Sequence, residues 1–100
     1  MSILLASQCR AARAMLGYSQ KDLAKRSEVG SRTLADFETG TRTPHPRTLK
    51  AIREALEDAG VIFLPAEPTL GPGIRLKQAD TPSLNLIPLE EALNLFMNEP

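Results

Sequence analysis

Apolar residues recur three and four positions apart in the first sixty residues of this chain, and the pattern changes after them. Such spacing gathers apolar side chains on one face of a helix. It predicts a helix over residues 7–16, a second that begins after Ser19, a third from about Ser31 to Thr39, and a fourth that enters at Pro46 and ends at Gly60. We therefore expect four or five short helices around one core.

Each predicted helix has an apolar face that we expect to turn inward. These faces consist of Cys9, Ala12 and Leu16; Leu23 and Ala24; Leu34 and Phe37; and Leu49, Ile52 and Leu56. The last helix also has a charged face, which amphipathic patterning assigns to solvent. Its members are Lys50, Arg53, Glu54 and Glu57.

The stretch from Ser19 to Gly40 has the layout of two short helices around a tight turn. Ser19 is a good N-cap for the first of these helices. Two helices that cross steeply need a small residue at their contact, which Ala24 supplies, and Val29 in the turn offers an apolar plug. Gly40 stands where a left-handed C-cap ends the second helix. The stretch therefore predicts a helix-turn-helix unit.

The outer face of the second helix in this unit carries short polar side chains and an arginine. Such a face suits the major groove of DNA, where donors, acceptors and the thymine methyl distinguish the bases. Arg32 could bind guanine in a forked pair, and Ser31 or Thr33 could meet a base edge or methyl. Asp36 could accept from cytosine or simply orient Arg32. Since exposed arginines also bind phosphate, both kinds of contact remain open for Arg32.

Two motifs in this unit carry a family resemblance. Ser-Gln-x-x-Leu-Ala begins at Ser19, and Thr-Leu-x-x-Phe-Glu-x-Gly begins at Thr33. With these motifs, the segment from about Cys9 to Gly60 resembles the Cro-like (XRE) helix-turn-helix family of phage and bacterial repressors. The resemblance implies a double-stranded DNA-binding regulator whose third helix enters the major groove.

The resemblance also implies roles for individual residues. Gln20 would touch the DNA backbone from the start of the second helix, and Arg13 on the first helix would pair with Glu38 on the third. The base-reading positions would be Gly30, Ser31, Arg32 and Asp36. On the residues themselves, we expect Ser19, Thr41 and Arg42 to contact phosphates.

The chain departs from the family pattern at two positions of the turn. Glu28 stands where the family commonly has glycine, and a side chain in a left-handed conformation costs about 1 kcal/mol. Gly30 stands where the family commonly has Ser or Thr before the third helix. Glycine still caps a helix, with a loss of only a few tenths of a kcal/mol.

Beyond Gly60 the pattern favours β-structure. Val61–Leu64 and Ile74–Lys77 are short strand-like runs, and prolines and glycines break the chain between them. We predict a hairpin with a long, stiff loop. A lone two-stranded hairpin is marginal in water, so it must lie on the helices or join strands of a second chain, of which we favour the second.

The last twenty residues predict a short helix. Pro88 can begin it, and Leu89, Leu93 and Phe96 form an apolar stripe at helical spacing. The stripe could fold back on its own domain or pack against its equivalent across a two-fold axis, and we favour the dimer. The predicted fold is therefore mainly α: a four- to five-helix repressor-like DNA-binding domain over residues 1–60, then a C-terminal β-hairpin and short helix over residues 61–100 as a dimerisation region.

The distribution of charge supports a DNA partner although the formal net charge is zero. Residues 1–60 hold ten Lys and Arg against seven acidic residues, and residues 61–100 hold two against five, so the two parts carry +3 and −3. A basic module with an acidic extension is consistent with modest, salt-sensitive DNA binding.

Other classes of function find little support in the composition. Cys9 is the only cysteine and His45 the only histidine, so no disulfide framework, metal site or catalytic cluster is indicated. We expect no cofactor and no enzymatic activity. The apolar start lacks the basic residues of a signal peptide, and no stretch has the length of a membrane span, so we expect a cytoplasmic protein without membrane contact.

These patterns together predict a sequence-specific, double-stranded DNA-binding transcriptional regulator, a homodimeric repressor. The alternative is an antitoxin, which would bind a toxin through its C-terminal region and repress its own promoter with the same DNA module. A small-molecule sensor is disfavoured, because about forty residues of hairpin and helix leave little room for a pocket of roughly 300 Å³ or more.

Overall fold

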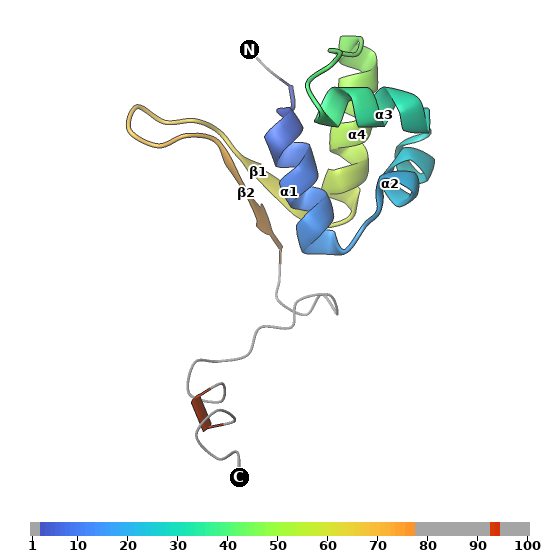
Figure 1. Ribbon diagram of the computed structural model, residues 1–100. Helices are drawn as coiled ribbons and strands as arrows, with labels where there is room; N and C mark the ends of the chain where they lie inside the picture. Colours follow the sequence, from blue (N-terminus) through green and yellow to red (C-terminus); the bar gives the residue numbers. More distant parts are fainter. Residues whose placement is uncertain (1–2, 78–92, 95–100) are drawn as a thin grey trace.

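The computed structural model describes residues 3–77 and 93–94 (Figure 1). Its described part holds four helices followed by a two-stranded antiparallel hairpin, which confirms the predicted fold class. The elements are α1 (Ala6–Leu16), α2 (Gln20–Ser27), α3 (Ser31–Glu38), α4 (Pro46–Asp58), β1 (Val61–Leu64) and β2 (Gly73–Leu76). The C-terminal helix predicted from Pro88, with its stripe of Leu89, Leu93 and Phe96, lies outside the described residues except for 93–94.

The core lies between the four helices and consists of the predicted apolar faces. All ten inward residues predicted from helical spacing are buried, and Leu23, Leu34, Ile52 and Leu56 have no exposed surface. Leu4 and Val61, which flank the helical segment, complete the buried cluster. Burying a side chain of this size contributes about 1.5–3 kcal/mol, so these faces dominate the stability of the domain.

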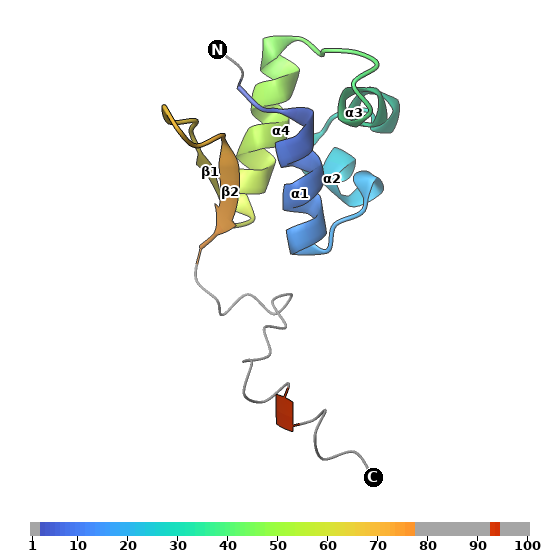
Figure 2. The ribbon, with the colours of Figure 1, turned by 60° about the vertical axis from the view of Figure 1, so that its left-hand side comes forward.

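The base of the hairpin packs on the helices. β1 and β2 pair from Val61 opposite Leu76 to Leu64 opposite Gly73. β1 contacts α4 and β2 contacts α1, and Phe63, Ile74 and Leu76 lie against the core (Figure 2). The hairpin was expected to pack either on the helices of its own chain or on strands of a second chain, and packing on its own helices is confirmed.

The distal part of the hairpin, residues 65–72, leaves the helical domain, and we call it the arm. All of its residues are exposed, and it projects away from the helices (Figure 1). Its tip is a tight turn in which Glu67 N donates to Leu70 O at 2.7 Å and Leu70 N donates to Glu67 O at 3.2 Å. The stiff loop predicted from its prolines and glycines is thus an ordered extension of the two strands.

Arg53 on α4 differs from the prediction that its side chain faces solvent. Its guanidinium lies over the Phe63 ring, 4.7 Å from the centroid, and Nη1 donates to Ile3 O at 2.7 Å. The prediction was wrong because the hairpin and the N-terminal residues cover this part of α4. Lys50 and Glu54 on the same helix are exposed as expected.

The turn between α2 and α3 has the left-handed residue expected from the sequence. Glu28 has φ +56° and ends α2, and its N–H donates to Lys25 O at 3.3 Å. Gly30 then caps α3 with an extended backbone and without a side-chain hydrogen bond. The two departures from the family pattern therefore keep the backbone of a tight turn, at the cost of strain at Glu28.

We predict that Glu28→Gly stabilises the domain by about 1 kcal/mol, because glycine adopts the left-handed conformation without the steric cost of a Cβ. The free energy of unfolding in urea measures this change. Glu28→Ala removes the same charge but keeps a Cβ, so it should leave the stability nearly unchanged. Equal stabilisation by both variants would instead assign the effect to the lost charge.

Candidate nucleic-acid interface

α3 presents a polar face on the side of the helical domain away from the hairpin (Figures 1 and 2). Leu34, Phe37 and Glu38 point into the protein. Ser31 and Arg32 are exposed at the start of the helix, and Thr33 and Asp36 are half-buried. Inward packing of one side thus fixes which polar side chains the other side offers.

Arg32 and Asp36 form an ion pair along this exposed face. Arg32 Nε lies 3.5 Å from Asp36 Oδ2, one helical turn away, and the arginine side chain is 91% exposed. An exposed pair at this spacing contributes a few tenths of a kcal/mol, so it orients the guanidinium and leaves it available to a ligand. The contact matches the orienting role considered for Asp36 and does not exclude a base contact by either residue.

The loop after α3 folds back on the end of that helix. Gly40 has φ +80°, which confirms the left-handed glycine expected there. Thr41 N and Arg42 N both donate to Asp36 O, at 2.9 and 3.2 Å, and Thr41 Oγ1 lies 2.8 Å from Thr39 Oγ1. The side chains of Thr41 and Arg42 are exposed beside the C-terminal end of α3.

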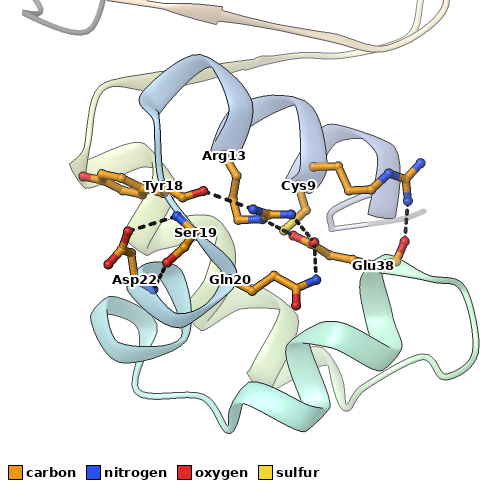
Figure 3. Close-up of polar contacts among 8 residues, drawn as sticks. Cys9, Arg13, Tyr18, Ser19, Gln20, Asp22 and Glu38 are labelled. Atoms are coloured by element: carbon orange, nitrogen blue, oxygen red, sulfur yellow. Dashed lines mark hydrogen bonds and ion pairs between the residues drawn. The ribbon is translucent and has the colours of Figure 1, made fainter.

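Ser19 caps α2 in a reciprocal arrangement (Figure 3). Asp22 N donates to Ser19 Oγ at 3.0 Å, and Ser19 N donates to Asp22 Oδ2 at 2.9 Å. The hydrogen bonds from Ser19 hold the pKa of the Asp22 carboxyl below its usual value. Ser19 is therefore the predicted N-cap, and the start of α2 is fixed in place.

Gln20, the first residue of α2, turns its side-chain amide toward the protein interior. Its Nε2 donates to Glu38 Oε1 at 2.9 Å, which links the start of α2 to the end of α3. The residue is only half-buried. The structure thus gives Gln20 a positioning contact, and the phosphate contact implied by the family resemblance stays a prediction.

Glu38 is the centre of this side of the protein, and four donors surround its carboxylate (Figure 3). Oε1 accepts from Arg13 Nη2 at 2.7 Å as well as from Gln20, and Oε2 accepts from Arg13 Nε at 2.8 Å and from Cys9 Sγ at 3.1 Å. Arg10 Nη1 donates to the backbone carbonyl of Glu38. The pairing of Arg13 with Glu38 implied by the resemblance is confirmed, and it is bidentate.

The protonation of this cluster follows from burial opposed by hydrogen bonds. Burial alone would raise the pKa of Glu38, but the hydrogen bonds from Arg13, Gln20 and Cys9 outweigh it and lower the pKa below its usual value. Burial, together with the bond to Glu38, raises the pKa of the Cys9 thiol. At neutral pH the cluster therefore holds a carboxylate, a guanidinium and a neutral thiol.

The sequence did not indicate every member of this cluster. Cys9 is buried as predicted, but its bond to Glu38 was missed, as were the contacts of Arg10 and Gln20 with that residue. A helical period places Cys9 and Arg13 four positions apart on one face, which is a signal that they meet the same neighbour. No comparable signal links Gln20 to Glu38.

His45, which the sequence places in a loop, is the N-cap of α4. Its Nδ1 accepts from Arg47 N at 3.0 Å, and Pro46 occupies the first helical position. The imidazole therefore has a structural role at the entry of α4, close in sequence to Thr41 and Arg42.

The helix-turn-helix family model matches residues 10–57, from the first half of α1 to the penultimate residue of α4. The four-helix domain belongs to the helix-turn-helix family. It is a DNA-binding domain of the XRE type found in transcription regulators, and the family is not one of enzymes. No curated protein matches the chain.

The residues predicted to contact DNA lie in two neighbouring parts of the domain. Ser31, Arg32, Thr33 and Asp36 lie on one helix, and Thr41 and Arg42 are tied to its end. Ser19 and Gln20 lie at the start of α2, which Glu38 joins to α3.

No helix in the described residues is long and apolar enough to cross a membrane.

We predict that breaking the Arg13–Glu38 pair from one side is worse than removing both partners. Arg13→Met or Glu38→Leu leaves one charge of the pair without its partner and should cost about 3–5 kcal/mol, whereas the double variant Arg13→Met/Glu38→Leu should cost less than either. Urea unfolding of the three variants measures the difference. Additive losses would mean that the two side chains act independently.

We also predict that Glu38 makes the domain sensitive to acid. Its pKa in the folded protein lies below the unfolded value, about 4.3, so its stabilisation is present above that pH and is lost as the pH falls through the folded value. The difference in unfolding free energy between wild type and Arg13→Met/Glu38→Leu should therefore be smaller below pH 4 than at neutral pH. That variant keeps Asp22, so an unchanged gap at low pH would exclude Glu38 as the source.

Proposed function

We propose that the protein is a sequence-specific transcriptional repressor that binds double-stranded DNA as a homodimer, with α3 in the major groove. The observation that carries this proposal is the exposed polar face of α3, where Arg32 is oriented by Asp36. Membership of a family of DNA-binding regulators supports it.

The base-reading set in this proposal lies on and before α3. Arg32 reaches furthest from the helix and would form the forked pair with guanine, while Ser31 and Thr33 meet neighbouring base edges. Asp36 either orients Arg32 or accepts from cytosine. Gly30 at the N-cap lets the backbone approach the DNA closely, because it has no side chain.

The phosphate contacts would frame this set from both sides. Ser19 and Gln20 at the start of α2 face one strand, where backbone N–H groups of the helix add to the attraction for phosphate. Thr41 and Arg42 at the end of α3 face the other, and their backbone bonds to Asp36 hold them in register with the reading helix. Such contacts fix the position of the domain and carry no base information.

A homodimer would place two α3 helices about 34 Å apart, one turn of DNA. The selection of bound sites from random duplexes tests the whole proposal. A two-fold symmetric motif is the expected result. A single half-site would contradict the proposed dimer, and the absence of any enriched sequence would contradict sequence-specific binding.

The antitoxin alternative is favoured by one observation, the exposure of Ile62 and Leu64 on the outer face of β1. A toxin could cover these apolar side chains. Purification of the native protein in a stable complex with a second polypeptide, whose toxicity it neutralises, would support this function over a dedicated repressor.

We predict that Arg32→Ala lowers affinity for the selected site by about 1–3 kcal/mol and relaxes one base position. Arg42→Ala should weaken binding to all sequences alike and reduce the slope of log affinity against log salt by about one. Fluorescence anisotropy with selected and scrambled duplexes measures both effects. Arg75→Ala, an exposed arginine on the hairpin, is the matched control and should change neither.

If Arg32→Ala instead weakens selected and scrambled duplexes equally, Arg32 contacts a phosphate. A change of base preference in Arg42→Ala would contradict its assignment to the backbone.

A further inference from the structure

A cleft of about 510 Å³ separates the beginning of α1 from the hairpin. Leu5 and Gln8 form one wall, Leu64 and Pro72 form the other, and Arg53 and Phe63 lie between them. Gln8 Nε2 donates to Gly73 O at 3.2 Å, which ties α1 to β2 at the base of the cleft. The hairpin, which contributes one wall of the cleft, lies on the opposite side of the domain from α3 (Figure 2).

Leu5 occupies a position in this cleft that its own helix does not favour. It is the N-cap of α1, with an extended backbone and no side-chain cap. Leucine is among the poorer N-caps, and Ser or Asp would cap the helix better. Instead, an apolar side chain that is 36% exposed lines the cleft. Departures from a local preference are expected at functional or strained positions, and this one lies on the surface of the cleft.

Pro65, Ala66 and Pro72 at the base of the arm belong to the lining of the cleft in their own chain, whereas residues 67–71 at its tip do not. This tip has the properties of an occupant for the cleft of another copy. Four of the eight residues of the arm are Pro or Ala, and Leu70 at its tip is 62% exposed. Prolines and the closed turn fix its shape in advance, which reduces the entropy lost when it binds. Leu70 is more exposed than the other exposed large apolar side chains in the described residues.

The charges of arm and cleft are complementary. Glu67 is the only charged residue in the sequence of the arm. Among the described residues that line the cleft, Arg53 is the only charged one. The Arg53 side chain is 35% exposed, and Nε lies 3.5 Å from its present acidic neighbour, Glu57 Oε2. The guanidinium can therefore still donate a hydrogen bond to a second carboxylate. The same molecule thus carries an apolar arm with one negative charge and an apolar cleft with one positive charge.

We propose that the cleft binds the arm of a second copy of this chain, in a reciprocal exchange about a two-fold axis. Leu70 of each copy lies between Leu5 and the hairpin of the other, and Glu67 approaches Arg53. Such an isologous contact needs one surface that is complementary to itself, which the arm and cleft together supply. The inference rests on the proposed homodimer and assigns its interface, and it leaves both α3 faces open to DNA.

The first test places a charge on each side of this contact in the full-length protein. Leu70→Asp alters an exposed side chain, and Leu5→Asp supplies the missing N-cap of α1, so neither change should destabilise the monomer. Both should weaken dimerisation by at least about tenfold in sedimentation equilibrium, because a charge would be buried in an apolar site. Leu5→Asp should at the same time raise the unfolding free energy of the monomer, an outcome that separates loss of the interface from loss of the fold.

The control Leu93→Asp changes an apolar residue of the C-terminal stripe and should leave dimerisation unchanged. A monomer in Leu93→Asp together with an intact dimer in Leu70→Asp would overturn the proposal and assign the interface to the stripe. A wild-type protein that is monomeric at all concentrations would remove the homodimer itself, while the binding of a DNA half-site would still test α3 separately.

The second test reverses the charge of the arm. Glu67→Arg should weaken dimerisation by about fivefold through repulsion from Arg53, and Glu67→Gln should have a smaller effect. Glu54→Arg makes the same change on an exposed part of α4 that does not line the cleft, and it should leave the dimer intact. Equal effects of Glu67→Arg and Glu54→Arg would reduce the role of Glu67 to net charge and contradict the proposed pairing.

Discussion

A carboxylate that is removed from water needs a donor for each of its lone pairs, and Glu38 imposes this requirement where α3 meets α1 and α2. Its side chain has 1% of its surface exposed, and its hydrogen bonds come from Cys9 and Arg13 on α1 and from Gln20 on α2. Because the three helices must meet at one point to supply these donors, their relative positions are restricted. Apolar packing alone tolerates small shifts, whereas a buried charge does not.

This arrangement fixes the orientation of the exposed face of α3. Leu34 and Phe37 anchor the helix in the core, and Glu38 fixes its end against α1 and α2. The loop with Thr41 and Arg42 is then attached to the same helix through Asp36 O. The residues proposed to contact bases and phosphates are thus parts of one rigid unit, and binding DNA would require little ordering of this surface.

The sequence predicted the parts of the structure that depend on local pattern. Helical spacing of apolar residues located α1 to α4, and the glycines Gly40 and Gly60 marked the ends of α3 and α4 correctly, because both signals depend on neighbours in the chain. Contacts between elements that are distant in the sequence were harder to predict. Arg53 has a polar helical face around it, yet Phe63 and Ile3 cover its side chain, and nothing in α4 itself indicates where the hairpin lies. The pair of Arg13 and Glu38 came from a family resemblance, while the contributions of Cys9 and Gln20 needed the three-dimensional arrangement.

The burial of Cys9 also gives the protein an internal reporter. It is the only thiol in the sequence, it has no exposed surface, and burial and Glu38 raise its pKa. Alkylating reagents attack the thiolate of an accessible cysteine, so the native protein can react only when α1 moves away from α3. The alkylation rate therefore measures how often this junction opens, on a timescale from seconds to hours, without an introduced label. Compared with and without bound DNA, that rate would show whether DNA binding changes how often the buried junction around Glu38 opens.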